Sequence, residues 1–146
     1  MEDNQQELVV IRGLPGSGKS TYAKKHFSES SWDHFENDMY FMRDSMYKFD
    51  EKKAHAAANW CYYSVSKSLL SGKSVVVSNV FVSRGAVNRY KELAEDIGAK
   101  FRVIRLEADF GNVHDVPVKV YQSMKSCFQD WPGEEVIKQS ELEADR

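Results

Sequence analysis

The sequence has only two cysteines among its 146 residues. Cys61 and Cys127 are far apart, and neither belongs to a C-x-x-C pair or to a cysteine-histidine cluster. This spacing excludes a disulfide-rich scaffold and the usual kinds of zinc site, so we expect buried thiols in a reducing environment. Long hydrophobic runs are missing as well, because no apolar run exceeds about five residues, whereas a membrane-spanning helix needs about 20.

The amino terminus and the overall charge exclude further classes. Residues 1–6, MEDNQQ, lack the basic start and the apolar core of a secretion signal, so we expect a cytoplasmic protein. The formal net charge is −2, so no basic field over the whole molecule attracts nucleic acid, and a polynucleotide would need a local patch. The length fits one domain over residues 1–146, with a core at about 7–131 and a charged tail at 132–146.

A glycine-rich motif organises the rest of the chain. Residues 13–20, GLPGSGKS, match the phosphate-loop (P-loop, or Walker A) pattern G-x-x-x-x-G-K-[ST] in full. Glycines let successive backbone N–H groups converge on phosphate oxygens, where side chains would block the approach. The motif follows an apolar run at 8–11, typical of a buried strand, and precedes a helical pattern at 20–27, so it predicts binding of ATP or GTP. The expected nucleotide contacts are Gly13, Leu14, Pro15, Gly16, Ser17, Gly18, Lys19, Ser20 and Thr21.

Two side chains of the motif are expected to take part in the chemistry. Lys19 carries a positive charge towards the β- and γ-phosphates, and Ser20 offers its hydroxyl to Mg²⁺. The helix that follows adds the positive end of its dipole. ATP and Mg²⁺ are therefore the expected cofactors.

Asp38 is the first candidate for catalysis outside the loop. It follows a short predicted strand at 32–36, and ligands gather at the carboxyl ends of strands in open α/β sheets. A carboxylate there would accept the proton of an attacking hydroxyl or hold a water on Mg²⁺, and the alternative is a helix N-cap. The aromatic segment at 39–50 is expected to be irregular and to pack over the site.

The third predicted strand, 74–78, ends at Asn79, where many P-loop proteins have an acid that supports Mg²⁺. An amide supplies no charge, so either Asp38 does that work or Ser20, the nucleotide and water hold the metal. The next predicted helix begins with Arg84, which heads a modest excess of basic residues. A solvated helix face explains that excess about as well as a phosphate-binding patch does.

The rest of the sequence continues the alternation of helices and strands. A long helix is expected at 51–70 and a fourth strand at 101–106. Pro117 starts the last long helix, with Val120 and Met124 in its buried stripe. This alternation predicts an α/β domain of three layers with a small parallel sheet, the P-loop NTPase fold.

Several motifs together resemble those of small P-loop kinases of bacteria and phages, similar to the kinase domain of phage-type polynucleotide 5′-hydroxyl kinases. The resemblance covers residues 8–131. It rests on IRGLPGSGKST at 11–21, Asn-Asp at 37–38, YKFD at 47–50, VVVSNVF at 75–81 and GNVHDVP at 111–117. It implies a nucleoside- or polynucleotide-kinase-like fold, ATP with Mg²⁺, and Asp38 as the general base for an attacking hydroxyl.

The sequence departs from that family at its substrate-binding positions. The arginine that helps to hold the substrate phosphate is matched by Phe41, although Arg43 is nearby. The acid after the third strand is replaced by Asn79. The substrate candidates outside the lid are Arg43, Asn79 and Arg84.

The lid departs as well. It is shortened to 109–117, and no arginine occurs between Leu106 and Asp145. Arginine-type stabilisation in phosphoryl transfer is worth roughly 10³–10⁵ in rate, so this loss affects the expected chemistry. The lid groups expected to close over the site are Asn112 and His114, and the cations that could replace arginine are His114, Lys119 and Lys125.

Two functions of different classes fit these features. The first is an ATP-dependent phosphotransferase that moves the γ-phosphoryl group to a hydroxyl acceptor, such as a nucleic-acid 5′ end, a nucleoside or another small hydroxyl compound. The acidic balance of charge favours a short or small acceptor over a long duplex. The second is an ATP-binding or ATP-hydrolysing switch module that acts on a protein partner. No membrane partner is expected for either.

Overall fold

The structure is a computed structural model that describes residues 5–43, 46–47, 51–111 and 116–145. The elements are β1 (Glu7–Arg12), α1 (Lys19–His26), β2 (Trp32–Phe35), the 3₁₀ turn η1 (Asn37–Phe41), β3 (Met42–Arg43), β4 (Met46–Tyr47), the 3₁₀ turn η2 (Glu51–Lys53), α2 (Ala54–Leu70), β5 (Ser74–Asn79), α3 (Arg84–Ile97), β6 (Lys100–Glu107), α4 (Val118–Cys127), β7 (Glu135–Lys138) and α5 (Gln139–Asp145).

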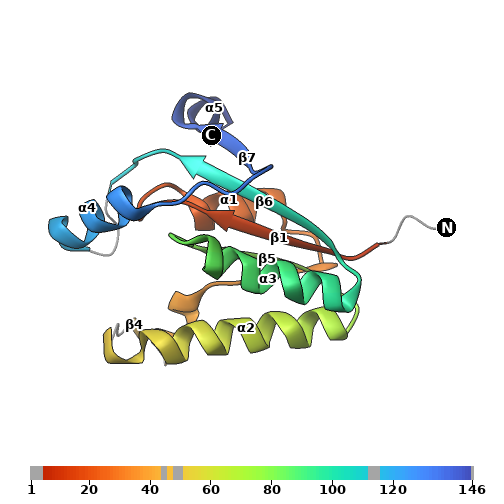
Figure 1. Ribbon diagram of the computed structural model, residues 1–146. Coiled ribbons are helices and arrows are strands. Elements are labelled where there is room, and N and C mark those ends of the chain that lie inside the picture. Colours follow the sequence, from red (N-terminus) through yellow and green to blue (C-terminus); the bar gives the residue numbers. More distant parts are fainter. Residues whose placement is uncertain (1–4, 44–45, 48–50, 112–115, 146) are drawn as a thin grey trace.

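Five of the strands form one parallel sheet in the order β2-β5-β1-β6-β7 (Figure 1). The central strand β1 is bonded on both sides, with Val10 in register with Val77 of β5 and Val103 of β6. All five strands run in the same direction, so their carboxyl ends share one edge of the sheet. The glycine loop leaves β1 at that edge.

Helices cover both faces of the sheet (Figure 1). Leu8 and Val10 of β1 pack with α2 and α3 on one face. Val9 and Ile11 pack with α1 and α5 on the other. A strand that is buried on both faces reads as an unbroken apolar run, which explains the pattern in the sequence. The expected α/β fold of three layers with a small parallel sheet is confirmed.

Two features of the carboxyl-terminal part differ from expectation. The predicted buried stripe of the last long helix is wrong, because α4 buries none of its residues and Val120 is 42% exposed. The tail beyond residue 131 adds a fifth strand, β7, to the sheet and then α5, whose Leu142 is buried. In the part of the chain that the structure describes, no helix has both the length and the apolar character needed to cross a membrane.

Candidate nucleotide-binding site

The glycine loop has the backbone shape that its sequence predicts. It connects β1, buried along its length, to α1, and a hydrogen bond from Ser17 N–H to the Leu14 carbonyl (3.1 Å) closes its turn. Gly16 and Gly18 adopt positive φ values of 82° and 91°, a conformation that residues with a Cβ rarely adopt. Gly18 also stands at the N-cap of α1, so the free N–H groups of the first helical turn face the loop.

Lys19 lies deep in this loop. Its ammonium group donates to the carbonyl oxygen of Leu14 at 3.1 Å. Burial lowers the pKa of Lys19 to about 8, although the negative charges of Glu36 and Asp38 act in the opposite direction. The site therefore holds a lysine whose charge becomes more favourable as soon as an anion enters.

Glu36 is a candidate site residue that the sequence reasoning missed. Its carboxylate accepts hydrogen bonds from the hydroxyl of Ser20 and from that of Ser78 (2.7 Å), and His34 Nε2 lies 3.1 Å away. Burial alone would raise the pKa of Glu36, but the bonds from His34, Ser20 and Ser78 outweigh it and lower the pKa to about 2. The available signal was its position directly after β2, two residues before Asp38.

Asp38 lies in the first turn of η1, which follows β2. The N–H of Asn37 at the start of η1 donates to the side-chain oxygen of Asn79 at 2.8 Å. Asn79 thus supports the turn that carries Asp38. Both Asp38 and Glu36 act electrostatically on Lys19, so the two acids and the lysine belong to one site.

Among the side chains that the structure describes, none of the other sequence candidates forms a hydrogen bond or ion pair with Lys19, Ser20 or Glu36. Arg43 ends β3, and Arg84 at the start of α3 donates through Nε to the carbonyl of Asp130 (2.7 Å). Asn112 and His114 lie outside the described residues. The candidate lid cations Lys119 and Lys125 are both exposed on α4. Lys125 lines a cavity of ≈ 460 Å³ beside the first residues of the loop, Gly13 and Leu14.

The chain that leaves β6 lies directly against the glycine loop. Phe110 N–H donates to the Gly16 carbonyl at 2.8 Å. A Cβ at Gly16 would overlap the carbonyl oxygen of Gly111, and a Cβ at Gly18 would lie 3.5 Å from the Phe110 ring. Close contact with this segment is a second reason why glycine is required at position 16, whereas at Gly18 the positive φ is the reason.

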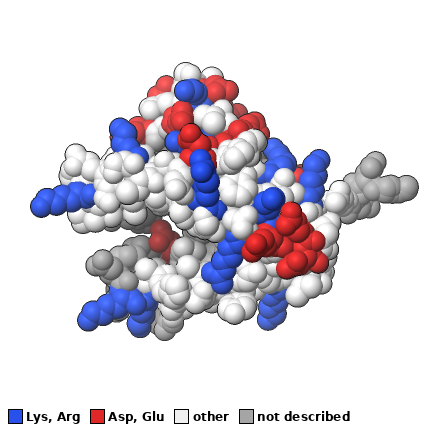
Figure 2. Space-filling view, viewed as in Figure 1, with Lys and Arg blue, Asp and Glu red and all other residues white. Residues whose placement is uncertain are grey.

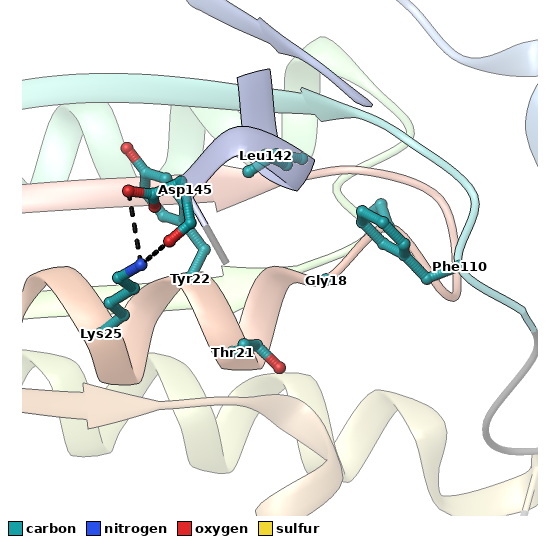
Figure 3. A pocket seen from close by; sticks show the side chains of 8 residues that line it. Gly18, Thr21, Tyr22, Lys25, Phe110, Leu142 and Asp145 are labelled. Atoms are coloured by element: carbon teal, nitrogen blue, oxygen red, sulfur yellow. Dashed lines mark hydrogen bonds and ion pairs between the residues drawn. The ribbon is translucent and has the colours of Figure 1, made fainter. Parts of the chain in front are cut away.

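A small cavity of ≈ 40 Å³ lies beside the loop, between α1 and α5 (Figure 3). Phe110 lies on one side of it, and Tyr22 and Leu142 line the other. Lys25 and Asp145 form an ion pair at 3.4 Å that connects the two helices at its rim. Ligand pockets usually measure about 300–1,000 Å³, so Phe110 or α5 must shift before a nucleoside can occupy this space.

On the other side of the loop the molecule has an open cleft. Figure 2 shows it between the part that carries α4 and the part that carries the start of α2, with acidic side-chain atoms inside. The carboxyl ends of β2 and β1 and the turn η1 belong to this edge of the sheet.

The residues next to the loop fit a magnesium ion. The Ser20 hydroxyl and the Glu36 carboxylate are adjacent hard oxygen donors of the kind that Mg²⁺ prefers. Among the described residues, no group of three or more His, Cys, Asp and Glu side chains could hold a metal by itself. These two side chains would therefore share the ion with nucleotide phosphates and water.

A glycine loop between a buried parallel strand and a helix, with Lys19 and Ser20 at its end, defines a P-loop nucleotide-binding protein of the kinase-like type. The chain belongs to the AAA_33 family, whose model, described as an AAA domain, matches residues 8–122.

Comparisons with other proteins agree with this assignment. An uncharacterized protein of Pasteurella multocida, PM0531, is 29% identical over 150 residues, which cover 90% of this chain and 82% of that protein. A gluconokinase from Sinorhizobium meliloti has a similar structure, with a TM-score of 0.63 and 15% identity over 94% of this chain and 84% of that one.

A second similar structure is the Pnkp1/Rnl/Hen1 complex, with a TM-score of 0.60 and 18% identity. It covers 84% of this chain, which spans only 40% of the matched chain. At these identities the likeness concerns the fold. The expected resemblance to small P-loop kinases is confirmed at that level.

Proposed function

We propose that this protein is an ATP-dependent phosphotransferase that moves the γ-phosphoryl group of ATP to a hydroxyl acceptor. The observation that carries the proposal is the arrangement of two acids around the phosphate loop. Glu36 contacts the Ser20 hydroxyl, and Asp38 follows two residues later on the turn at the cleft. One carboxylate is therefore beside the expected metal, and the other lies on the turn that follows the same strand.

The side chains divide the work as follows. Lys19 and the loop N–H groups bind the phosphates and stabilise the charge that develops on them. Ser20 and Glu36 would hold Mg²⁺ with the phosphates and water, and the ion supplies charge neutralisation when bound. Asp38 accepts the proton of the acceptor hydroxyl. The hydroxyl oxygen forms a bond to the γ-phosphorus as the bond between that phosphorus and the ADP oxygen breaks.

The acceptor class follows from the cleft and the charges. Acidic groups in the cleft repel phosphates. The cleft therefore favours an acceptor that presents a hydroxyl group and carries few phosphates. A nucleoside, another small hydroxyl compound or a single nucleic-acid 5′ end fits that description. A long duplex fits it poorly.

The test incubates the protein with Mg²⁺ and γ-labelled ATP in the presence of 5′-hydroxyl DNA and RNA oligonucleotides and a nucleoside mixture. Asp38→Asn is compared with Asp96→Asn, a matched change at an exposed position on α3. We expect label on an acceptor in the wild type and in Asp96→Asn, and a loss of about 10²-fold or more in Asp38→Asn. Equal transfer by the two variants would refute the role of Asp38.

The lid supports a second candidate, an ATP-hydrolysing switch that acts on a protein partner. No arginine occurs between Leu106 and Asp145, and α4 buries none of its residues. A helix held so weakly could change position with the nucleotide state and so report it to a partner. Phosphate release that no hydroxyl acceptor alters, and that Lys19→Ala abolishes, would favour this function over transfer.

A further inference from the structure

Arg12 is a buried charge directly before the phosphate loop. It ends β1, where its backbone lies between Asn79 of β5 and Arg105 of β6, and its side chain is 0% exposed. Burial lowers the pKa of the Arg12 guanidinium, while the hydrogen bond that it donates to Glu134 opposes that effect. A buried charge is costly unless its N–H groups are paired, so its partners indicate what it is for.

One set of partners lies at the end of β5. The Phe81 carbonyl accepts from Arg12 Nε at 3.1 Å and from Nη2 at 2.5 Å. Phe81 is a non-glycine residue with a positive φ of 51°, a conformation that needs outside support. Two residues earlier, the Asn79 side chain accepts the N–H of Asn37 at the start of η1. Arg12 therefore supports the segment that orients the turn of Asp38.

The other partners follow α4. Arg12 Nη2 donates to the Gln129 carbonyl at 2.7 Å, and Nη1 pairs with Glu134 at 2.8 Å. The Phe128 ring lies 4.3 Å from the Arg12 guanidinium carbon and 4.6 Å from that of Arg105. Because α4 itself buries nothing, its position depends on its two ends, and this cluster fixes one of them.

We propose that Arg12 is a positioning residue that couples the segment after helix α4 to the turn that carries Asp38. A single planar guanidinium holds both segments at the root of the phosphate loop. The value of this coupling for catalysis rests on the proposed phosphotransfer, but the coupling itself is a property of the fold. Lysine in its place keeps the charge but has one nitrogen, so it cannot hold both carbonyls and Glu134 in the same way.

The test measures amide hydrogen exchange in the full-length protein by NMR. Two amides report on the two segments: Asn37 N–H, bonded to Asn79, and Gln129 N–H, bonded to the Val82 carbonyl at 2.9 Å. In Arg12→Lys we expect both to exchange about tenfold faster or more, since charge-assisted hydrogen bonds are lost. Phe110 N–H, bonded to Gly16 on the other side of the loop, should keep its wild-type rate.

Two further variants make the result decisive. Arg102 of β6 is exposed and pairs with Glu7 and Glu135 in the described structure, so Arg102→Lys should alter none of the three amides. Glu134→Gln leaves the shape of the cluster intact and should make the same two amides exchange faster, to a smaller degree than Arg12→Lys does. This variant tests the coupling even if Arg12→Lys does not fold. Unchanged exchange, faster exchange at only one of the two amides, or equally faster exchange at all three would overturn the coupling.

A kinetic measurement separates this inference from the proposed function. If transfer to an acceptor is found, Arg12→Lys should lower kcat about tenfold or more while the Kd for Mg·ATP stays within about twofold, because the loop itself is intact. A matching loss in nucleotide affinity would overturn a positioning role. If no acceptor is found, the proposed function fails, and the exchange rates still decide the role of Arg12.

Discussion

Binding of a nucleotide should be accompanied by proton uptake at Lys19. The pKa of this lysine is lowered to about 8 in the free protein, mainly by burial. The phosphates of a bound nucleotide bring several negative charges next to the ammonium group and raise its pKa again. At pH 8 about half of the free protein carries a neutral Lys19, so binding should take up roughly half a proton per site.

The same shift fixes how affinity depends on pH. The charged lysine is present in nearly all molecules at pH 7 and in roughly one tenth of them at pH 9, so the affinity for Mg·ADP should fall about tenfold over that range. The stability of the free protein depends on pH in the opposite direction. The folded state binds fewer protons at Lys19 than the unfolded chain between pH 8 and about 10.5, so this group makes the free protein more stable as the pH rises through that window.

Isothermal titration calorimetry of Mg·ADP in two buffers of different ionisation heat measures the uptake directly. The diphosphate is already deprotonated at pH 8, because phosphate groups lose their second proton near pH 6, so it contributes little itself. Lys19→Arg is the control, since arginine stays charged and should remove the uptake wherever it still binds. Zero uptake by the wild type at pH 8, together with an affinity that does not change from pH 7 to pH 9, would refute the reasoning.

Four further outcomes are expected. Gly16→Ala should weaken nucleotide binding more than about tenfold in a fluorescence titration, because its Cβ would overlap a carbonyl of the segment after β6 and its φ is 82°. Leu142→Ala should lower the free energy of unfolding in urea by about 2–4 kcal/mol, and a change under about 0.5 kcal/mol would contradict the packing of α5. Iodoacetamide at pH 8 should label the exposed Cys127 but not Cys61, whose pKa burial raises to about 11, as mass spectrometry can show. The pKa of Glu36 is lowered to about 2, so its carboxylate contributes stability above pH about 4.5, and this stability is lost as the pH falls towards 2. The difference in unfolding free energy between wild type and Glu36→Gln, measured by urea unfolding, should therefore become smaller from pH 7 to pH 3.

The sequence was sufficient for the centre of the fold. An apolar run, a complete P-loop motif and a helical pattern are local signals, and they correctly predicted β1, the loop and α1. The helix that was predicted to begin at Arg84 is α3, and it buries Val87 and Tyr90. The apolar spacing of α3 matches its burial, and β1 is an unbroken apolar run that is buried on both faces.

The structure of the carboxyl-terminal part could not be predicted from local sequence patterns in the same way. The strand β7, with the sequence EVIK, is short and carries two charges, so nothing local distinguishes it from a solvated tail. It exists because its neighbour β6 offers a free parallel edge. The apolar spacing of α4 suits a buried helix, yet no element packs over it in the described structure, and spacing alone does not show whether a partner is present.

Glu36 and Asn79 show why a positional rule missed an acid of the site. The rule looks for an acid at the end of the third predicted strand, and the sequence has an amide there. In the sheet, however, β2 and β5 are neighbours and end at the same edge. The carboxylate of Glu36, directly after β2, accepts a hydrogen bond from the Ser20 hydroxyl. It also accepts one at 2.7 Å from the hydroxyl of Ser78, the residue before Asn79.

This arrangement separates two tasks that one acid would otherwise share. The charge next to Ser20 comes from Glu36, so Asn79 is free to accept the N–H of Asn37 and hold the turn of Asp38. An aspartate at position 79 would accept the same hydrogen bond, but it would add a third negative charge near Lys19 and repel the phosphates that the loop must bind. The amide therefore suits position 79 once an acid lies on the neighbouring strand, and the proposed phosphotransfer requires a charge at a point in space, whichever strand supplies it.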